Sequence, residues 1–158
     1  MIALRAVEAA DLDVLFEQQL DPEAINMAAF TVEDPHDREA FERRWQRILG
    51  DPTITTRTIV ADDEVAGSIS TWRNPELAGR EVTYWLGREF WGRGIATLAL
   101  RAFLDEVTER PIYGRCAADN VGSLRVLEKC GFARIRADRG FANARRTEID
   151  EFVLELRE

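Results

Sequence analysis

A glycine-bearing stretch at positions 86–97 carries the clearest chemistry in the sequence. It runs from a strand-like segment into a helix-like one and reads Leu86-Gly87-Arg88-Glu89-Phe90-Trp91-Gly92-Arg93-Gly94-Ile95-Ala96-Thr97. The first turn of a helix leaves about four backbone N–H groups without partners, and the aligned peptide dipoles place roughly half a positive charge there. Gly92 and Gly94 allow a tight turn and a close approach of a ligand to the backbone, while Arg93 adds a permanent positive charge. The stretch therefore predicts a phosphate or pyrophosphate site, and the alternative is a glycine loop that merely joins a strand to a helix.

Two other phosphate-binding loops fit this spacing less well. A P-loop needs a lysine beside a Ser or Thr, and residues 88–104 contain no lysine. A dinucleotide-binding loop would use a βαβ unit over 81–117, with Asp119 as the ribose-binding acid. However, the position of its third glycine is Thr97, and only one such unit is present.

The surrounding pattern predicts a single mixed α/β domain over residues 1–158, because the chain has no internal repeat, linker or low-complexity tract. Apolar spacing predicts helices from Asp11 to Asp21, near 22–29 and 37–49, and at 94–108 and 121–130. It predicts strands at 2–7, 53–61, 64–72, 81–87, 112–117, 132–137 and 149–156. The segment 21–50, called the flap below, and a basic loop at 138–147 with Arg139, Arg145 and Arg146 are expected to shape a substrate pocket.

Composition excludes several classes of protein. A net charge of -8 argues against a sequence-independent nucleic-acid binder, which needs a basic face, and makes a cationic partner easier to imagine. No run approaches the roughly 18 apolar residues of a membrane span, and residues 1–10 lack the features of a secretory signal, so we expect a cytoplasmic location. Cys116 and Cys130 match no metal-ligand spacing and are expected to be reduced structural residues, so no metal is predicted.

Two motifs in this order resemble the GNAT acetyltransferase family. The first is Trp91-Gly92-Arg93-Gly94-Ile95-Ala96, similar to the acyl-CoA loop of that family. The second is the segment 119–132, Asp-Asn-Val-Gly-Ser-Leu-Arg-Val-Leu-Glu-Lys-Cys-Gly-Phe, similar to its Asn-x-x-Ser…Leu-x-Lys-x-Gly-Phe segment. Tyr84-Trp85-Leu86 followed by Trp-Gly-x-Gly is similar to the branch that acetylates N-termini of ribosomal proteins. Trp91 departs from the Gln or Arg that is general in the family but is usual in this branch.

The resemblance implies a central, mostly antiparallel sheet that splays between two parallel strands, 81–87 and 112–117, with helices on both faces. It places the pyrophosphate of acetyl-CoA on the amides of Gly92 to Thr97, with the Thr97 hydroxyl as an additional contact. It places the pantetheine arm along Leu86 and Gly87 and near Asn120. It thus implies an acetyl-CoA-dependent N-acetyltransferase acting by direct attack in a ternary complex. The alternative is a non-catalytic acyl-CoA-binding or sensory module on the same fold.

Three catalytic roles need residues: a base for the amine, a donor to the carbonyl oxygen and an acid for the leaving thiolate. The resemblance favours Glu81 as the base, directly or through water, over a solvent-facing Glu; His36, the only histidine, fits a loop better. A backbone N–H near Leu86 or Gly87 is expected to stabilise the oxygen. Many members of the family have a tyrosine as the acid where this chain has Leu127, so Ser123 is the available hydroxyl. Ser123 could equally cap the following helix, as could Asn120.

The predicted partners are therefore acetyl-CoA and a primary amine, which is either a protein N-terminus or a small molecule. We expect no nucleic acid and no membrane as partners. A homodimer is a further expectation.

Overall fold

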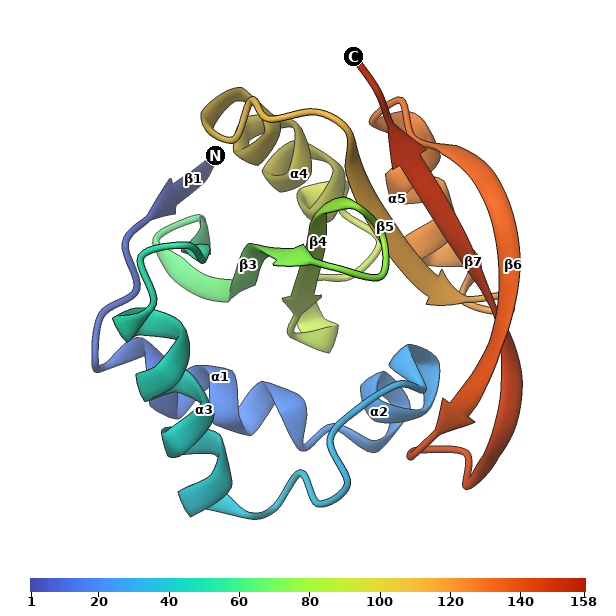
Figure 1. Cartoon of the computed structure of the whole chain (residues 1–158). Helices are drawn as coiled ribbons and strands as arrows, with labels where there is room; N and C mark the ends of the chain where they lie inside the picture. Colours follow the sequence, from blue (N-terminus) through green and yellow to red (C-terminus); the bar gives the residue numbers. More distant parts are fainter.

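A seven-stranded sheet runs through the computed structural model, which describes residues 1–158 (Figure 1). The strands follow the order β1-β2-β3-β4-β5-β7-β6, and every neighbouring pair is antiparallel except β4 and β5. The predicted mixed sheet with one parallel pair is therefore confirmed. The strands are β1 (Ile2–Arg5), β2 (Thr55–Ala61), β3 (Glu64–Asn74), β4 (Gly79–Leu86), β5 (Ile112–Ala117), β6 (Ala133–Ala142) and β7 (Thr147–Leu156).

Helices cover both sides of this sheet. In Figure 1, α1 (Asp11–Gln19), α2 (Pro22–Ala28) and α3 (Arg38–Gly50) lie below the central strands, whereas α4 (Ile95–Glu106) and α5 (Val121–Lys129) lie above them. A short 3₁₀ helix, η1 (Arg88–Phe90), connects β4 to the loop before α4. None of the helices combines the length and apolarity needed to cross a membrane.

Local sequence signals explain where the flap helices begin. The Asp21 carboxylate accepts hydrogen bonds from the amides of Glu23 and Ala24, and Pro22 occupies the first position of α2. Asp37 caps α3 in the same way, through the amide of Ala40. Both aspartates satisfy N–H groups that a helix start leaves without partners, so these helices begin where the sequence predicts.

The parallel pair β4 and β5 is joined over only part of its length. Arg80, Glu81 and Val82 pair with residues 112–114, although β4 continues to Leu86 and β5 to Ala117. The two strands therefore separate beyond Val82. This is the predicted splay, and it leaves the edge of β4 that faces β5 without a partner strand over residues 84–86.

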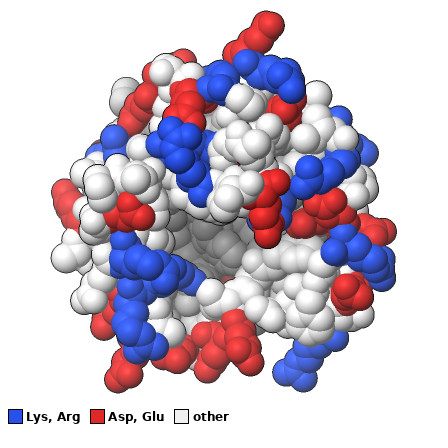
Figure 2. All heavy atoms as spheres, viewed as in Figure 1, with Lys and Arg blue, Asp and Glu red and all other residues white.

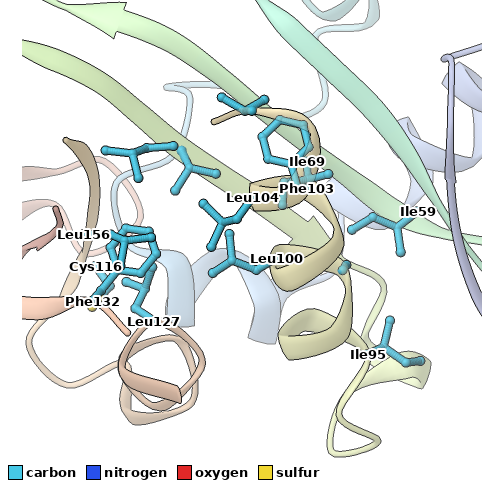
Figure 3. Packing of buried hydrophobic residues seen from close by; sticks show 14 of the residues in the cluster. Ile59, Ile69, Ile95, Leu100, Phe103, Leu104, Cys116, Leu127, Phe132 and Leu156 are labelled. Carbon is cyan, nitrogen blue, oxygen red and sulfur yellow. The ribbon is translucent and has the colours of Figure 1, made fainter. Parts of the chain in front are cut away.

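The main core lies between the sheet and α4. Phe103 of α4 lies beside Ile69 of the sheet, whereas Leu100 and Leu104 point from the same helix toward the side of the cluster that holds Cys116, Leu127 and Leu156 (Figure 3). Leu98 on the same helix is 49% exposed, so α4 is buried along one face only. One buried face suffices to hold the beginning of α4 against the sheet.

The expected loop at 138–147 is for the most part a hairpin. β6 continues to Ala142 and β7 begins at Thr147, so only the tip is irregular. Apolar and polar residues alternate from Ala133 to Asp138, which is why the sequence predicts a strand at 132–137. The alternation ends at Arg139-Gly140, so no pattern marks the rest of this mostly exposed edge strand.

The tip of this hairpin is tied to the flap by hydrogen bonds to main-chain carbonyls. The Asn143 side chain donates to the carbonyl of Thr31 at 2.7 Å, and the Ala144 amide donates to that of Ala29 at 3.1 Å. Arg145 donates to the carbonyl of Asn26 at 2.9 Å and forms a bidentate ion pair with Asp119. The hairpin therefore holds the flap against the sheet.

Candidate active site

The beginning of α4 has the geometry of an anion site. Gly92 and Gly94 have φ values of 72° and 75°, which side chains rarely adopt, and a Cβ added to either would meet no atom within 4 Å. No side chain caps the helix. The first intrahelical bond runs from the Leu98 amide to the Gly94 carbonyl, so the amides of residues 95–97 remain available to a ligand.

A cavity of about 510 Å³, called the α4–α5 cavity, opens beside these amides. It contains every residue that the sequence predicts to bind the cofactor except Gly87 and Arg93. The predicted residues that line it are Leu86, Trp91, Gly92, Gly94, Ile95, Ala96, Thr97, Asn120 and Ser123. The two motifs, far apart in the sequence, therefore meet at one cavity.

Gly87 and Arg93 are directed elsewhere. The Gly87 amide donates to the Ala66 carbonyl at 2.9 Å, which leaves it unable to bind a ligand oxygen. Arg93 forms an ion pair with Asp62 at 2.9 Å, and its guanidinium lies outside the α4–α5 cavity.

Two other cations line this cavity, and the sequence reasoning missed them. Arg125 and Lys129 lie one turn apart on α5, and neither has a carboxylate within 4.0 Å. Their spacing of four residues on the helix that begins at Asn120 is the signal that could have identified them.

Trp91 fixes the glycine loop to the end of β4. Its indole N–H donates to the Leu86 carbonyl at 3.1 Å. This bond gives Trp91 a structural role in the loop before Gly92. It occupies the Leu86 carbonyl and does not involve the Leu86 amide.

A pair of hydroxyls lies where α5 approaches β4. The Oγ of Ser123 and the Oη of Tyr84 are 2.8 Å apart. Asn120 caps α5 by accepting from the Ser123 amide at 3.2 Å, so the Ser123 hydroxyl is not used as a cap. Burial raises the pKa of the Tyr84 phenol above its ordinary value, so it remains protonated.

Tyr84 is the residue that sequence reasoning overlooked. It provides a phenol from β4 beside Ser123, whereas the resemblance points to the position of Leu127 on α5 for such a group. Leu127 at that helix position is 2% exposed, and a Cβ on Gly114 would come within 2.7 Å of it. Leu127 therefore belongs to the core.

Glu81 lies deeper in the sheet and lines neither of the two large cavities. Its Oε1 accepts from Asn74 at 2.9 Å and is 3.1 Å from the Arg115 guanidinium. No protein group donates to Oε2. A water chain would have to link that oxygen to an amine.

His36 and the two cysteines lie apart from these groups. His36 is exposed, beside Asp34. Cys116 and Cys130 are free thiols, and burial raises the pKa of the Cys116 thiol to about 11. A thiol that stays protonated is a poor nucleophile, which agrees with a structural role.

A second cavity of about 610 Å³, called the flap cavity, lies between the flap and strands β3 and β4. Figure 2 shows the molecule hollowed at the centre of this face, with Lys and Arg side chains along part of the border. The flap lines it as predicted, but residues 138–147 do not. Tyr84 and Trp85 line both cavities, so the two adjoin at β4.

Comparison with known proteins gives one family for this architecture. The family model described as an acetyltransferase (GNAT) domain matches residues 2–133. The uncharacterized N-acetyltransferase p20 of Bacillus licheniformis is 27% identical over 166 residues, which cover 98% of this chain and 92% of p20.

Two solved structures share the fold at lower identity. The microcin C7 self-immunity acetyltransferase MccE, in complex with acetyl-CoA and AMP, has a TM-score of 0.82 and 17% identity over 99% of this chain and 92% of MccE. RimL, a ribosomal L7/L12 alpha-N-protein acetyltransferase in complex with coenzyme A, has a TM-score of 0.77 and 19% identity over 96% of this chain and 92% of RimL. With its two motifs joined at one cavity and a family match over most of its length, this chain belongs to the GNAT acetyltransferases and is an acetyl-CoA-dependent acyltransferase.

Proposed function

We propose that this protein transfers the acetyl group of acetyl-CoA to a primary amine by direct attack while both substrates are bound. The observation that carries this proposal is the meeting of the two cavities at Tyr84 and Trp85, beside the Ser123 hydroxyl. One substrate can thus reach the other without a covalent intermediate on the protein.

The α4–α5 cavity suits the donor substrate. The amides of residues 95–97 bind the pyrophosphate, and Arg125 and Lys129 provide positive charge near the phosphates. The unpaired edge of β4 provides backbone groups for the pantetheine arm, near Asn120. Bound acetyl-CoA in MccE and bound coenzyme A in RimL support this use of the fold.

The residues around the junction divide the chemistry among them. The amine nitrogen bonds to the thioester carbon as the carbon–sulfur bond breaks. Backbone direction alternates along a strand, so the Leu86 amide points away from β3, toward the splay, where it can donate to the carbonyl oxygen. Ser123 protonates the departing sulfur and recovers a proton from Tyr84, which takes up a proton from water in turn and so returns to its protonated form. The amine proton leaves through water to Glu81 Oε2.

The cellular location and the oligomeric state complete the proposal. Free thiols at Cys116 and Cys130 support the predicted cytoplasmic location. A homodimer stays a prediction.

Incubation of the protein with acetyl-CoA and a panel of amines tests the proposal. We expect release of free CoA thiol and an acetylated amine of matching mass. If acetyl-CoA binds but no amine gives thiol release, the transferase proposal is wrong and the protein is an acyl-CoA-binding module.

A further inference from the structure

The flap cavity contains two positive charges without counter-charges. Of its charged residues, Arg73 forms an ion pair with Glu109 at 2.7 Å, and Asp51 accepts hydrogen bonds from Thr53. Arg44 and Arg47 line the cavity from α3, and neither has a carboxylate within 4.0 Å. The whole protein has a net charge of -8, so this cavity is a locally positive site in an acidic protein.

Arg44 is held in place by groups that do not neutralise it. Its guanidinium lies 5.6 Å from the centre of the Phe41 ring and donates to Gln19 Oε1 at 3.1 Å. Gln19 is fixed in turn by its bond to the Pro35 carbonyl at 2.7 Å. A guanidinium has several further N–H donors in a planar fork that matches the oxygens of an anion. Burial, together with the charge of Arg47, lowers the pKa of Arg44, and a bound anion would relieve that unfavourable pairing.

A third donor lies between the two arginines in the sequence. Trp45 lines the same cavity and is 6% exposed, yet its indole N–H has no hydrogen-bond partner. A buried donor without an acceptor is uncommon in proteins and calls for an acceptor from elsewhere. This nitrogen is itself covered, so the ligand contacts proposed below are those of Arg44 and Arg47 alone.

We propose that the acceptor is a small amine that also carries an anionic group, a carboxylate or a phosphate, bound by Arg44 and Arg47. The anionic group lies at the α3 side of the flap cavity, and the amine lies at the other side, beside Tyr84 and Trp85. This inference rests on the proposed function, because it names the substrate class of that reaction. It replaces the cationic acceptor that net charge alone made easier to imagine.

The size of the cavity favours a small molecule over a protein chain. Its volume of about 610 Å³ lies within the range of roughly 300–1,000 Å³ typical of small-molecule sites. Its lining combines aromatic and aliphatic side chains, among them Phe41 and Trp45, with hydroxyls of β3 and β4. Arg44 and Arg47 are its cations without an ion-pair partner, so they are the groups expected to favour an anionic ligand. A compact amine with an acidic end fits this lining.

Matched amines test the charge preference. We would compare β-alanine with β-alaninamide, phosphoethanolamine with ethanolamine, putrescine as a cation, and a short peptide with a free N-terminus. The acidic member of at least one pair should have a kcat/KM about 10-fold or more above its neutral counterpart. The pair that shows it distinguishes carboxylate from phosphate.

Variants of the two arginines test whether these side chains cause the preference for acidic amines. Arg44→Gln and Arg47→Gln should each lower kcat/KM for the acidic amine about 10- to 100-fold, chiefly through KM, with little change for the neutral amine. Arg43→Gln is the matched control, since Arg43 lies on the same helix, pairs with Glu39 and does not line the cavity. It should leave both rates within about 2-fold of the wild type.

An anion titration separates failure of this inference from failure of the proposed function. With CoA saturating the other cavity, succinate or inorganic phosphate should bind to the wild type, as measured by calorimetry, and not to the Arg44→Gln, Arg47→Gln double variant. Absence of turnover with any amine overturns the transferase, and the titration then decides the anion site alone. The anion site is overturned if neither anion binds, or if neutral, cationic or peptide amines are preferred and the arginine variants leave that preference unchanged.

Discussion

The hydrogen bond between Ser123 and Tyr84 links the two hydroxyls that could protonate a departing thiolate. Because Asn120 caps α5, removal of the Ser123 hydroxyl should disturb the proton transfer without releasing the helix. Ser123→Ala should lower kcat about 100-fold or more, within the range usual for loss of a general acid. Calorimetry should show nearly unchanged affinity for acetyl-CoA.

Two companion variants make this test specific. Tyr84→Phe should lower kcat by a smaller factor, because Ser123 would have to recover its proton from water. Asn120→Ala should lower the melting temperature, since loss of a helix cap costs about 1 kcal/mol. A normal kcat for Ser123→Ala would leave water as the proton source.

Glu81 gives a second prediction for a single side chain. Glu81→Gln should lower kcat and flatten the acidic side of the pH–rate profile, with acetyl-CoA affinity unchanged, because it removes a base and not a ligand contact. The variant should also lose about 1 kcal/mol of stability, because the Arg115 guanidinium loses the nearer of its two carboxylates and keeps only Glu151, at 3.8 Å. A lower melting temperature with an unaltered profile would reduce Glu81 to a structural residue.

The individual residues show how far sequence reasoning reaches. The glycines and Ser123 could be found because a fixed spacing along the chain defines each of them. Tyr84 could not, because its pairing with Ser123 joins residues 39 positions apart and depends on how α5 lies over β4. Arg93 was predicted to add positive charge at the phosphate site, but its ion-pair partner Asp62 comes from a turn far away in the sequence.

At the loop before α4, the effect of backbone strain can be tested separately from the effect of an added negative charge. At Gly94 a Cβ would meet nothing within 4 Å, but the φ of 75° disfavours any side chain. Gly94→Ala should therefore cost about 1–2 kcal/mol of stability while acetyl-CoA still binds. Gly94→Glu adds a negative charge beside the pyrophosphate, so calorimetry should detect no binding. Equal affinity in both variants would place the pyrophosphate elsewhere.

Helices and strands were predictable to different degrees. Asp21, Asp37 and Gly131 mark helix ends by side-chain or backbone chemistry that acts locally, so the boundaries near them agree with the sequence. The β6–β7 hairpin depends on pairing between strands, and its edge strand is charged along much of its length. Alternation of apolar and polar residues predicts its first half, 132–137, and no local pattern marks the rest.

A charged cluster joins the first segments of the chain into one unit. Asp11 at the start of α1 accepts from Arg5 of β1 at 2.7 and 2.8 Å and from Thr58 of β2 at 2.8 Å. The hydrogen bonds from Arg5, with those from Glu8 and Thr58, lower the pKa of the Asp11 carboxyl from 3.8 to about 2 despite its burial. The charged form is thus favoured in the folded protein.

The effect on stability follows from the direction of this shift. Because the folded-state pKa is depressed, the contribution is fully present above about pH 4 and is lost as the pH falls toward 2. The difference between 3.8 and about 2 corresponds to roughly 2 kcal/mol. Asp11→Asn should lose about that amount at pH 7, and its stability should depend less on pH between 5 and 2, as measured by urea unfolding. A parallel pH dependence in variant and wild type would show that other carboxyls cause the acid sensitivity.

The tie between the β6–β7 hairpin and the flap bears on how new substrates could be accommodated. Asn143, Ala144 and Arg145 all donate to main-chain carbonyls of the flap, and every residue type offers such a carbonyl. The side chains of Phe30 and Thr31 can therefore be exchanged without loss of these bonds. Random mutagenesis of Phe30 and Thr31, which line the flap cavity, should thus change amine preference more often than it unfolds the protein, and this makes them suitable first positions for directed evolution of acceptor range.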